Sequence, residues 1–318
     1  MKVLVTGGAG FIGSHFVDEL ARQGQHIIIY DNFSTGFRRH LDHALSSGRV
    51  NVVEGDILDS ATLVCAMEGV STVFHLAANA DVRGGITNRH IDIEQNVFGT
   101  HKVLEAMTAC GVKEIVFTSS ATVYGEPDRF PTTEDQPLIQ TSLYGASKLA
   151  AEAIIQAYGE YFGIRSYCFR FVSWIGERYS HGVVRDFVNK LLSNPRELEI
   201  LGDGEQRKSY LHVSDGVQGI FSAMDKIKGL KNVLNLGHVE YMNVKDVAEI
   251  ICQEMGLKDV EFRFTGGSRG WLGDSPFVLL DISRIQQTGF RPQISIEEGI
   301  RRTTRYLLDN RWLLEARR

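Results

Sequence analysis

Short runs of apolar residues alternate with longer amphipathic stretches through the first half of the chain. Six apolar runs predict strands, at 3–5, 27–30, 50–53, 73–76, 115–118 and 166–171. Four amphipathic stretches between them predict helices, at 12–23, 61–67, 94–109 and 143–162. Strands that alternate with helices are typical of an α/β fold with a doubly wound parallel sheet.

The alternation loosens after about residue 172, where glycine, proline and charged residues become denser. We therefore expect one domain over 1–172 and a smaller, mixed α/β domain over 173–318. A further buried strand is predicted at 233–236. The first domain is accordingly expected to receive about 211–240 as well, so that the two domains interleave.

Composition narrows the class of protein. The 318 residues are 43% apolar and 23% charged, as in soluble globular proteins. A net charge of −5 argues against nucleic acid as a partner, and no apolar run is long enough to span a membrane. The apolar run at the amino terminus is too short to be the core of a signal peptide, so the cytoplasm is the expected compartment. The four cysteines lie far apart, which indicates neither a metal site nor a disulfide framework.

A glycine-rich turn follows the first predicted strand. The residues Thr6-Gly7-Gly8-Ala9-Gly10-Phe11-Ile12-Gly13 satisfy the pattern Gly-x-Gly-x-x-Gly through Gly8, Gly10 and Gly13 and then open a helix. Glycine permits the tight turn and the approach of a pyrophosphate to the N–H groups at the helix start. The position between strand and helix predicts a dinucleotide site in a Rossmann-type domain.

An acidic residue, Asp31, ends the second predicted strand. Its carboxylate would accept hydrogen bonds from the adenosine ribose and repel a 2′-phosphate, so NAD is the predicted cofactor. Arg38 and Arg39 lie close enough to leave NADP open. Asp56 and Ile57, after the third strand, fit a contact to the adenine edge, and a helix-capping role for Asp56 fits as well.

Hydroxyl groups gather where the strand at 115–118 ends, in Ser119 and Ser120. Ligands bind at the carboxyl ends of such strands. On the next predicted helix, Tyr144 and Lys148 are one turn apart. Ser120 can therefore hold a substrate hydroxyl, Tyr144 can take its proton, and Lys148 can stabilise the phenolate. The same spacing recurs at Tyr241 and Lys245, where no accompanying motif favours more than a pair on a helix surface.

The predicted role of Lys148 is electrostatic. Lowering the pKa of a phenol from about 10 to about 7 requires about 4 kcal/mol. A unit positive charge about 4 Å away supplies that much at an intermediate dielectric. We therefore expect Tyr144 to accept a proton near neutral pH.

Together these motifs resemble the extended short-chain dehydrogenase/reductases, in particular the nucleotide-sugar epimerase and dehydratase family. The resemblance rests on the glycine turn, Asp31-Asn-Phe-Ser-Thr-Gly36, His75-Leu-Ala-Ala78, Ser119-Ser-Ala-Thr-Val-Tyr-Gly125 and Tyr144-x-x-x-Lys148, and it covers nearly the whole chain. It implies that NAD contacts Gly7, Gly10, Phe11, Ile12, Gly13, Asp31, Asn32, Ser34, Thr35, Gly36, Asp56, Ile57, Leu76, Ala77, Ala78, Asn96, Ser119, Tyr144 and Lys148. His75 is expected to be a buried strand histidine.

The residue types at two positions distinguish the reactions that the resemblance allows. Family members that dehydrate the sugar carry Asp-Glu before Val-Tyr-Gly, because β-elimination needs an acid and a base. Ala121 and Thr122 stand there in this chain. The Ser-Ala-Thr version resembles 4-epimerases, most closely those of UDP-hexoses, which oxidise C4 transiently to a 4-keto sugar. A dehydratase, reductase or decarboxylase of the family, or a non-catalytic NAD-binding regulator, remains the alternative.

The resemblance also implies a substrate set in the second half. Ser120, Thr122, Tyr144, Ser173, Val183, Arg207, Lys208 and Arg269 are the expected contacts of a nucleotide-diphosphate sugar. Lys208-Ser209 replaces the family's Arg-Asp, and Ser173 replaces its usual Asn. A homodimer through the two long helices of the first domain is expected by the same resemblance. The sequence determines neither the base nor the sugar.

Overall fold

Residues 1–316 are described by a computed structural model of the chain, and they form two compact units. The first unit contains 1–124, 140–170 and 220–234. The second contains 125–139, 171–219 and the residues from 235 onward. Residues 125–139, which fall inside the 1–172 range expected for the first domain, thus pack with the second unit.

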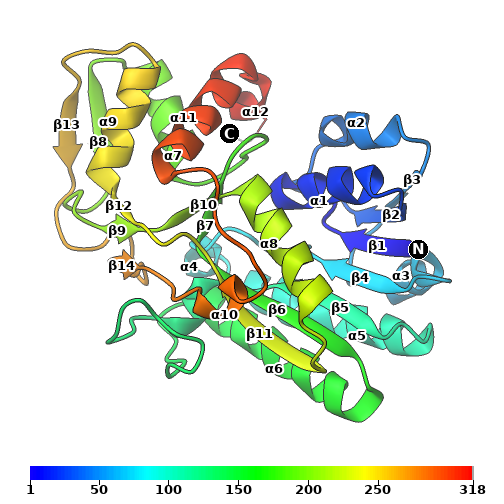
Figure 1. Ribbon diagram of the computed structural model, residues 1–318. Helices are drawn as coiled ribbons and strands as arrows, with labels where there is room; N and C mark the ends of the chain where they lie inside the picture. The colour runs from blue at the N-terminus through cyan, green and yellow to red at the C-terminus, as the bar shows by residue number, and fades with distance from the viewer. Residues whose placement is uncertain (317–318) are drawn as a thin grey trace. The chain divides into compact units, whose positions relative to one another are not determined.

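The first unit is built on a seven-stranded sheet with the order β11-β6-β5-β4-β1-β2-β3 (Figure 1). The pairings of β1 with β2 and β4, of β2 with β3, and of β5 with β4 and β6 are all parallel. The strands are β1 (Lys2–Thr6), β2 (His26–Asp31), β3 (Val50–Glu54), β4 (Thr72–His75), β5 (Glu114–Thr118), β6 (Arg165–Phe171) and β11 (Lys231–Leu236). The doubly wound α/β sheet predicted from the sequence is confirmed.

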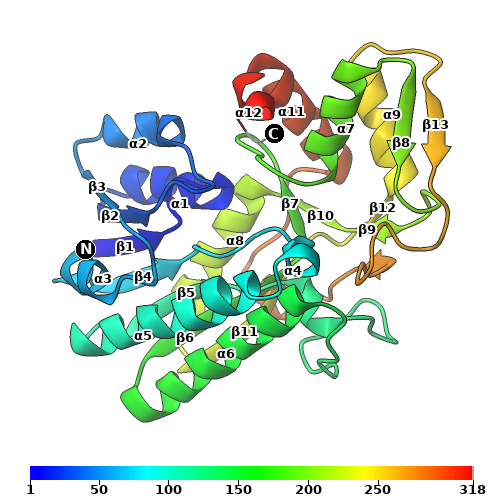
Figure 2. The same cartoon turned by 180° about the vertical axis from the view of Figure 1, so that it is seen from behind.

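Helices cover both faces of this sheet. In Figures 1 and 2, α5 and α6 lie side by side on one face, and α1 lies on the other. The helices are α1 (Phe11–Arg22), η1 (Arg38–Leu41), α2 (Asp42–Leu45), α3 (Ser60–Met67), α4 (Gly84–Thr87), η2 (Ile93–Phe98), α5 (Gly99–Ala109), η3 (Ala121–Tyr124) and α6 (Leu143–Phe162). A further helix, α8 (Val213–Lys226), begins in the second unit and ends in the first.

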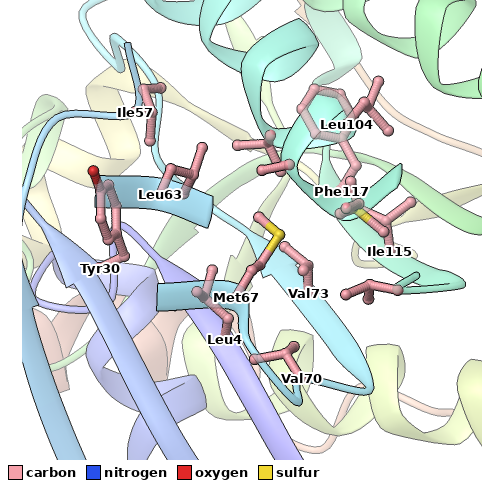
Figure 3. Packing of buried hydrophobic residues seen from close by; sticks show 14 of the residues in the cluster. Leu4, Tyr30, Ile57, Leu63, Met67, Val70, Val73, Leu104, Ile115 and Phe117 are labelled. Carbon is pink, nitrogen blue, oxygen red and sulfur yellow. The ribbon is translucent and has the colours of Figure 1, made fainter. Parts of the chain in front are cut away.

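Alternating side chains of the strands fill two layers of core. Figure 3 shows the layer under α3, α5 and α6, in which Leu4 and Phe117 from the sheet meet Met67 and Leu104 from the helices. All four of these side chains are fully or almost fully buried. This packing explains why the apolar runs could be recognised as strands, since strands buried on both faces read as continuous apolar sequence.

Three phenylalanine rings fill the opposite face. The ring of Phe16 in α1 lies 5.7 Å from those of Phe74 in β4 and Phe221 in α8. The rings of Phe74 and Phe221 are 5.9 Å apart. The C-terminal part of α8 therefore packs against the sheet of the first unit, beside α1.

The helix predicted at 94–109 is interrupted. Residues Ile93–Phe98 form a π-helical turn, and the α-helix α5 starts only at Gly99. The wider turn is compatible with an amphipathic pattern, which is why periodicity alone missed it. The turn contains buried Asn96, whose side chain accepts a hydrogen bond from the loop after β4.

The second unit consists of three small sheets and several helices. β7 (Ser173–Ile175) pairs with β10 (Tyr210–His212), β8 (Glu197–Ile200) pairs with β13 (Glu261–Phe264), and β9 (Arg207–Lys208) lies between β12 (Met242–Asn243) and β14 (Phe277–Val278). The helices are α7 (Val183–Ser193), α9 (Val244–Glu254), α10 (Ser283–Gln286), α11 (Ile296–Asp309) and α12 (Trp312–Glu315). Among residues 1–316, no helix has the length and apolarity needed to cross a membrane.

Candidate active site

The glycine turn between β1 and α1 is closely packed. Gly7 has a φ angle of +70°, and a Cβ atom on it would lie 2.7 Å from the backbone nitrogen of Ala77. A Cβ atom on Gly13 would lie 2.1 Å from the carbonyl oxygen of Gly7. Only glycine permits both approaches. The turn therefore brings the start of α1 against the predicted cofactor residues 76–78 that follow β4.

Asp31 holds this turn in place from the end of β2. Its carboxylate is 7% exposed and accepts hydrogen bonds from the backbone N–H groups of Ala9, at 2.9 Å, and Phe33, at 2.8 Å. Burial raises the pKa of the carboxyl group, and the two hydrogen bonds oppose that rise. Each carboxylate oxygen retains a second lone pair for a further donor.

The loops after β2 and β3 are tied together beside Asp31. Asn32 donates to the carboxylate of Asp56 at 2.9 Å, and Tyr30 donates to the carbonyl oxygen of Asp56, also at 2.9 Å. Ser34 donates its N–H to Asn32, while the side chain of Ile57 is buried in the core. The predicted adenosine residues thus come together, with Ile57 contributing mainly to packing.

Arg38, which left NADP open in the sequence, has partners of its own. It forms an ion pair with Glu54 at the end of β3. Its guanidinium carbon also lies 4.2 Å from the centre of the Phe33 ring. A phosphate bound by Arg38 would therefore have to compete with the carboxylate of Glu54.

A chain of hydrogen bonds runs through buried His75 at the end of β4. The Thr6 hydroxyl accepts from the N–H of Ala77 and contacts Nδ1 of His75 at 2.8 Å. Nε2 of His75 contacts the Thr100 hydroxyl at 3.0 Å, and that hydroxyl donates to the carbonyl oxygen of Asn96. These partners assign the ring proton to Nε2. Burial lowers the pKa of His75 to about 3, so the residue is a neutral structural histidine, as expected.

Asn96 in the π-helical turn joins three segments. Its side-chain oxygen accepts from the N–H of Asn79 at 2.8 Å, and its amide nitrogen donates to the Ser147 hydroxyl at 2.9 Å. Ser147 in turn donates to the carbonyl oxygen of Tyr144 at 2.8 Å. Asn79 and Ser147 were not identified from the sequence. Their only signal is polarity at positions on the inner face of a predicted helix or directly after a strand.

The side chains predicted for catalysis meet beyond the end of β5. The Thr122 hydroxyl donates to the Ser120 oxygen at 2.9 Å, and the Thr122 N–H also donates to it at 3.2 Å. Burial raises the pKa of the Tyr144 phenol, and a side-chain hydrogen bond with Ser120 acts to lower it. Hydrogen bonds therefore link Thr122, Ser120 and Tyr144.

Lys148 is buried one turn after Tyr144. Its Nζ donates to the carbonyl oxygen of Thr118 at 3.0 Å and lies 5.9 Å from the centre of the Tyr144 ring. Burial lowers the pKa of Lys148 to about 8, while the negative charges of Asp92 and Glu152 act to raise it. The ammonium group is consequently the majority form at neutral pH.

The expected pKa of Tyr144 is wrong in direction for the protein alone. Burial raises the pKa of this phenol well above its usual value, and Asp92 raises it further. The sequence argument assumed a cation about 4 Å away and ignored desolvation. In the structure the Lys148 ammonium group is directed at the Thr118 carbonyl, and its charge does not outweigh the cost of burying a phenolate.

A buried ion pair fixes the loop that carries Ser119. Arg170 of β6 and Glu152 of α6 are 2.7 Å apart, and their side chains are 5% and 1% exposed. Glu152 also accepts from the Ser119 hydroxyl, and Arg170 donates to the Tyr124 hydroxyl at 3.1 Å. The sequence did contain a signal for this pair, because Glu152 lies one turn after Lys148 and Arg170 interrupts an apolar strand.

The predicted cations of the second unit already have partners. Lys208 of β9 lies 2.6 Å from Asp274, and burial lowers the pKa of its ammonium group against the pull of that carboxylate. Arg269 lies 2.6 Å from Glu126. The structure therefore places both cations in ion pairs within the second unit.

Three further substrate residues were predicted in this unit. The Arg207 guanidinium lies 4.0 Å from the centre of the Phe277 ring. Ser173 is the exposed first residue of β7, and Val183 is the first residue of α7. Among residues 1–316, no group of three or more His, Cys, Asp and Glu side chains is placed to hold a metal ion.

Comparison with known proteins places the chain in a family. Residues 3–237 match the model of the NAD dependent epimerase/dehydratase family. UDP-glucose 4-epimerase of Mycolicibacterium smegmatis is 32% identical over 313 residues, which cover 96% of this chain and 98% of the relative.

Solved structures agree with this assignment. A UDP-galactose 4-epimerase is 36% identical, with a TM-score of 0.89 over 98% of this chain and 100% of the other. The dTDP-glucose 4,6-dehydratase DesIV of Streptomyces venezuelae, with NAD bound, is 29% identical, with a TM-score of 0.91 over 98% of each chain. The chain therefore belongs to the NAD dependent epimerase/dehydratase family, which confirms the family and the cofactor predicted from its motifs.

Proposed function

We propose that this protein is a 4-epimerase of a UDP-linked hexose. The observation that carries the proposal is the chain from Thr122 through Ser120 to Tyr144, with buried Lys148 beside it. Support comes also from the 4-epimerases among the relatives. A dehydratase has a nearly equal TM-score, so the overall fold does not distinguish the two reactions. The side chains of the site must therefore determine which reaction occurs.

The residues of the first unit fit NAD. Helix α1 begins after Gly10 without a side-chain cap, and the helix dipole at this end favours the negative charge of a pyrophosphate. The glycines at 7 and 13 keep this end of the helix free of side chains. Asp31 retains acceptor capacity for ribose hydroxyls.

We assign the cofactor contacts predicted from the sequence to NAD. They comprise the glycine turn (Gly7, Gly10, Phe11, Ile12 and Gly13), the segment after β2 (Asp31, Asn32, Ser34, Thr35 and Gly36), Asp56 and Ile57, residues 76–78, Asn96, Ser119, Tyr144 and Lys148.

Ser120, Tyr144 and Lys148 perform the proton transfer in this proposal. Ser120 positions a sugar hydroxyl, and Tyr144 accepts its proton and later returns it. Bound NAD supplies a hydride acceptor for C4 and a positive charge that favours the phenolate. Lys148 keeps its proton at neutral pH and stabilises the phenolate electrostatically.

The same geometry disfavours dehydration. Elimination of water needs an acid for the leaving hydroxyl and a base for the neighbouring C–H bond. Ala121 has no proton to give, and the Thr122 hydroxyl is engaged as a donor to Ser120. The site can therefore move one hydroxyl proton through Tyr144, which is what transient oxidation at C4 requires.

We propose that the second unit binds the nucleotide diphosphate through Ser173, Val183, Arg207, Lys208 and Arg269, with Ser120, Thr122 and Tyr144 at the sugar. Lys208 and Arg269 have their charges balanced by Asp274 and Glu126. A diphosphate would have to compete with these carboxylates. Arg207 contributes the third cation of this set. Its described contacts include the faces of the Tyr241 and Phe277 rings. The base and the exact sugar stay open.

We also propose that the protein is a homodimer, with a second copy covering the outer faces of α5 and α6. Apolar side chains are exposed on this part of the first unit, including Phe98 at 56% and Tyr161 at 80%. Exposed apolar side chains are typical of protein interfaces. The cytoplasmic location expected from the sequence stays a prediction.

The cofactor assignment predicts a selective loss when Asp31 is replaced. In D31N the neutral amide still accepts a hydrogen bond but no longer repels a 2′-phosphate. Losing a charged hydrogen-bond acceptor is expected to weaken NAD binding by roughly tenfold or more, with a smaller loss for NADP. Calorimetric titration of both cofactors measures this, and equal losses would contradict the assignment.

The proposed chemistry predicts that Y144F abolishes turnover without unfolding the protein. Purified enzyme is incubated with a panel of NDP-sugars, and the anomeric and H4 proton signals are followed by NMR. The matched control is Y241F, since Tyr241 belongs to the second Tyr-x-x-x-Lys sequence and is 44% exposed. Y241F is expected to retain activity. Silence of the wild type across the panel would instead support the non-catalytic regulator, and products of altered mass would support a dehydratase or decarboxylase.

The dimer proposal predicts that charge on the exposed face dissociates the protein. The variants F98E and Y161E are expected to sediment as monomers, because a buried unpaired carboxylate is costly at an interface. L272E is the control, since Leu272 is 82% exposed in the second unit. Analytical ultracentrifugation reads the result, and a monomeric wild type would exclude the proposal.

A further inference from the structure

One oxygen of a buried carboxylate beside the catalytic helix has no hydrogen-bond partner among the described residues. Asp92, the residue before η2, is 0% exposed. Its Oδ1 accepts from the side-chain amide of Asn79 at 2.8 Å, whereas Oδ2 has no hydrogen-bond partner among residues 1–316. A buried carboxylate with one oxygen unsatisfied is unfavourable for folding, so its retention calls for another role.

Asp92 lies against the start of α6. A Cβ atom on Gly85 would lie 2.8 Å from Oδ2 of Asp92 and 3.1 Å from Cβ of Leu143, so these two atoms flank the same point. Leu143 directly precedes Tyr144. Gly85 is therefore packed so closely between the carboxylate and the start of α6 that a side chain at this position would not fit.

A chain of hydrogen bonds also connects Asp92 to α6. Its Oδ1 is 3.5 Å from the side-chain nitrogen of Asn96, and that nitrogen donates to Ser147 at 2.9 Å. Ser147 donates to the backbone carbonyl of Tyr144. Displacement of Asp92 would thus be transmitted to the turn that carries Tyr144.

The charge of Asp92 acts on both members of the catalytic pair. It raises the pKa of Lys148, whose burial alone would lower it, and it raises the pKa of Tyr144. An anion favours the protonated form of each neighbour. For Lys148 this preserves the ammonium group, and for Tyr144 it holds the proton on the phenol.

The other charged groups around this pair have different partners. Glu152, which also raises the pKa of Lys148, is bound by Arg170. Burial raises the pKa of Asp92 itself, and the hydrogen bond from Asn79 opposes that rise. Asp81, from the loop after β4, raises it further, and Lys148 lowers it. Asp92 is therefore the buried carboxylate that acts on both Tyr144 and Lys148.

We propose that Asp92 is a positioning residue that sets the proton affinity of the Tyr144 and Lys148 pair. Its carboxylate keeps the desolvated Lys148 protonated, so that a cation is present when Tyr144 gives up its proton. The proposal rests on the proposed function for its catalytic meaning, but the electrostatic relation holds without turnover.

The experiment compares D92N with E94Q. Asparagine at 92 keeps an oxygen for Asn79 and removes only the charge, and E94Q removes the same charge two residues later on an exposed side chain. At an effective dielectric of about 20, removal of a nearby unit charge is expected to shift each pKa by roughly one unit or more. D92N is therefore expected to move both limbs of the kcat/KM profile to lower pH, while E94Q leaves the profile in place.

The conservative variant separates charge from shape. D92E keeps the carboxylate. The two limbs of its kcat/KM profile are therefore expected at the same pH values as in the wild type, even if the rate is lower. A D92N profile with a lower rate and unmoved limbs would show that Asp92 is merely structural and would overturn the proposal. D92S provides the same neutral comparison with a smaller side chain if D92N does not fold.

A second readout does not depend on activity. NMR of protein with isotope-labelled lysine, with the Lys148 signal assigned through its loss in K148M, follows the titration of that ammonium group directly. Burial lowers the pKa of Lys148 to about 8, and loss of the Asp92 charge is expected to lower it further in D92N. An unchanged titration would refute the proposal. A shifted titration in a protein that turns over no sugar would refute the proposed function and leave the role of Asp92 standing.

Discussion

The burial of the Lys148 ammonium group is the constraint on which the candidate site depends. A cation removed from water loses its proton unless hydrogen bonds and negative charges compensate. Here the Thr118 carbonyl at the end of β5 accepts its hydrogen bond, and Asp92 and Glu152 supply negative charge. These groups come from a strand, the residue before the π-helical turn and the catalytic helix, so the sheet and both helices must be correctly placed for Lys148 to remain charged.

Hydrogen bonds among Thr122, Ser120 and Tyr144 then determine which proton the site can move beside the charged Lys148. Thr122 donates to Ser120, whose hydrogen bond with Tyr144 lowers the pKa of that phenol against the larger effect of burial, and the Arg170 and Glu152 pair holds neighbouring Ser119. Because Thr122 is committed as a donor, the position where dehydratases carry an acid is occupied by a group that orients a serine. Small side chains at 121 and 122 thus favour epimerisation within a fold that also supports dehydration.

Much of the fold could be predicted from the sequence. Strands that are buried on both faces give continuous apolar runs, and the glycine turn is required where backbone segments approach closely. The apolar runs became the strands of the seven-stranded sheet, and α6 covers the range predicted for it. Periodicity could not reveal the π-helical turn at 93–98, since a single wide turn barely alters an amphipathic pattern. Asp92 was missed because a lone carboxylate directly before this turn carries no motif.

The electrostatic prediction failed where burial matters. Spacing along a helix gave the Tyr144 and Lys148 pair but not the depth of either side chain, and burial reverses the expected direction of the Tyr144 shift. Likewise, the partners of Lys208 and Arg269 are far away in sequence, so their ion pairs with Asp274 and Glu126 needed the three-dimensional structure.

Transient oxidation at C4 is tested most directly with a UDP-hexose that carries deuterium at C4. Epimerisation through Tyr144 and bound NAD predicts that the deuterium is found at C4 of both epimers at equilibrium, without exchange into water and without net accumulation of NADH. Loss of deuterium to solvent, or inversion at a different carbon, would contradict the mechanism.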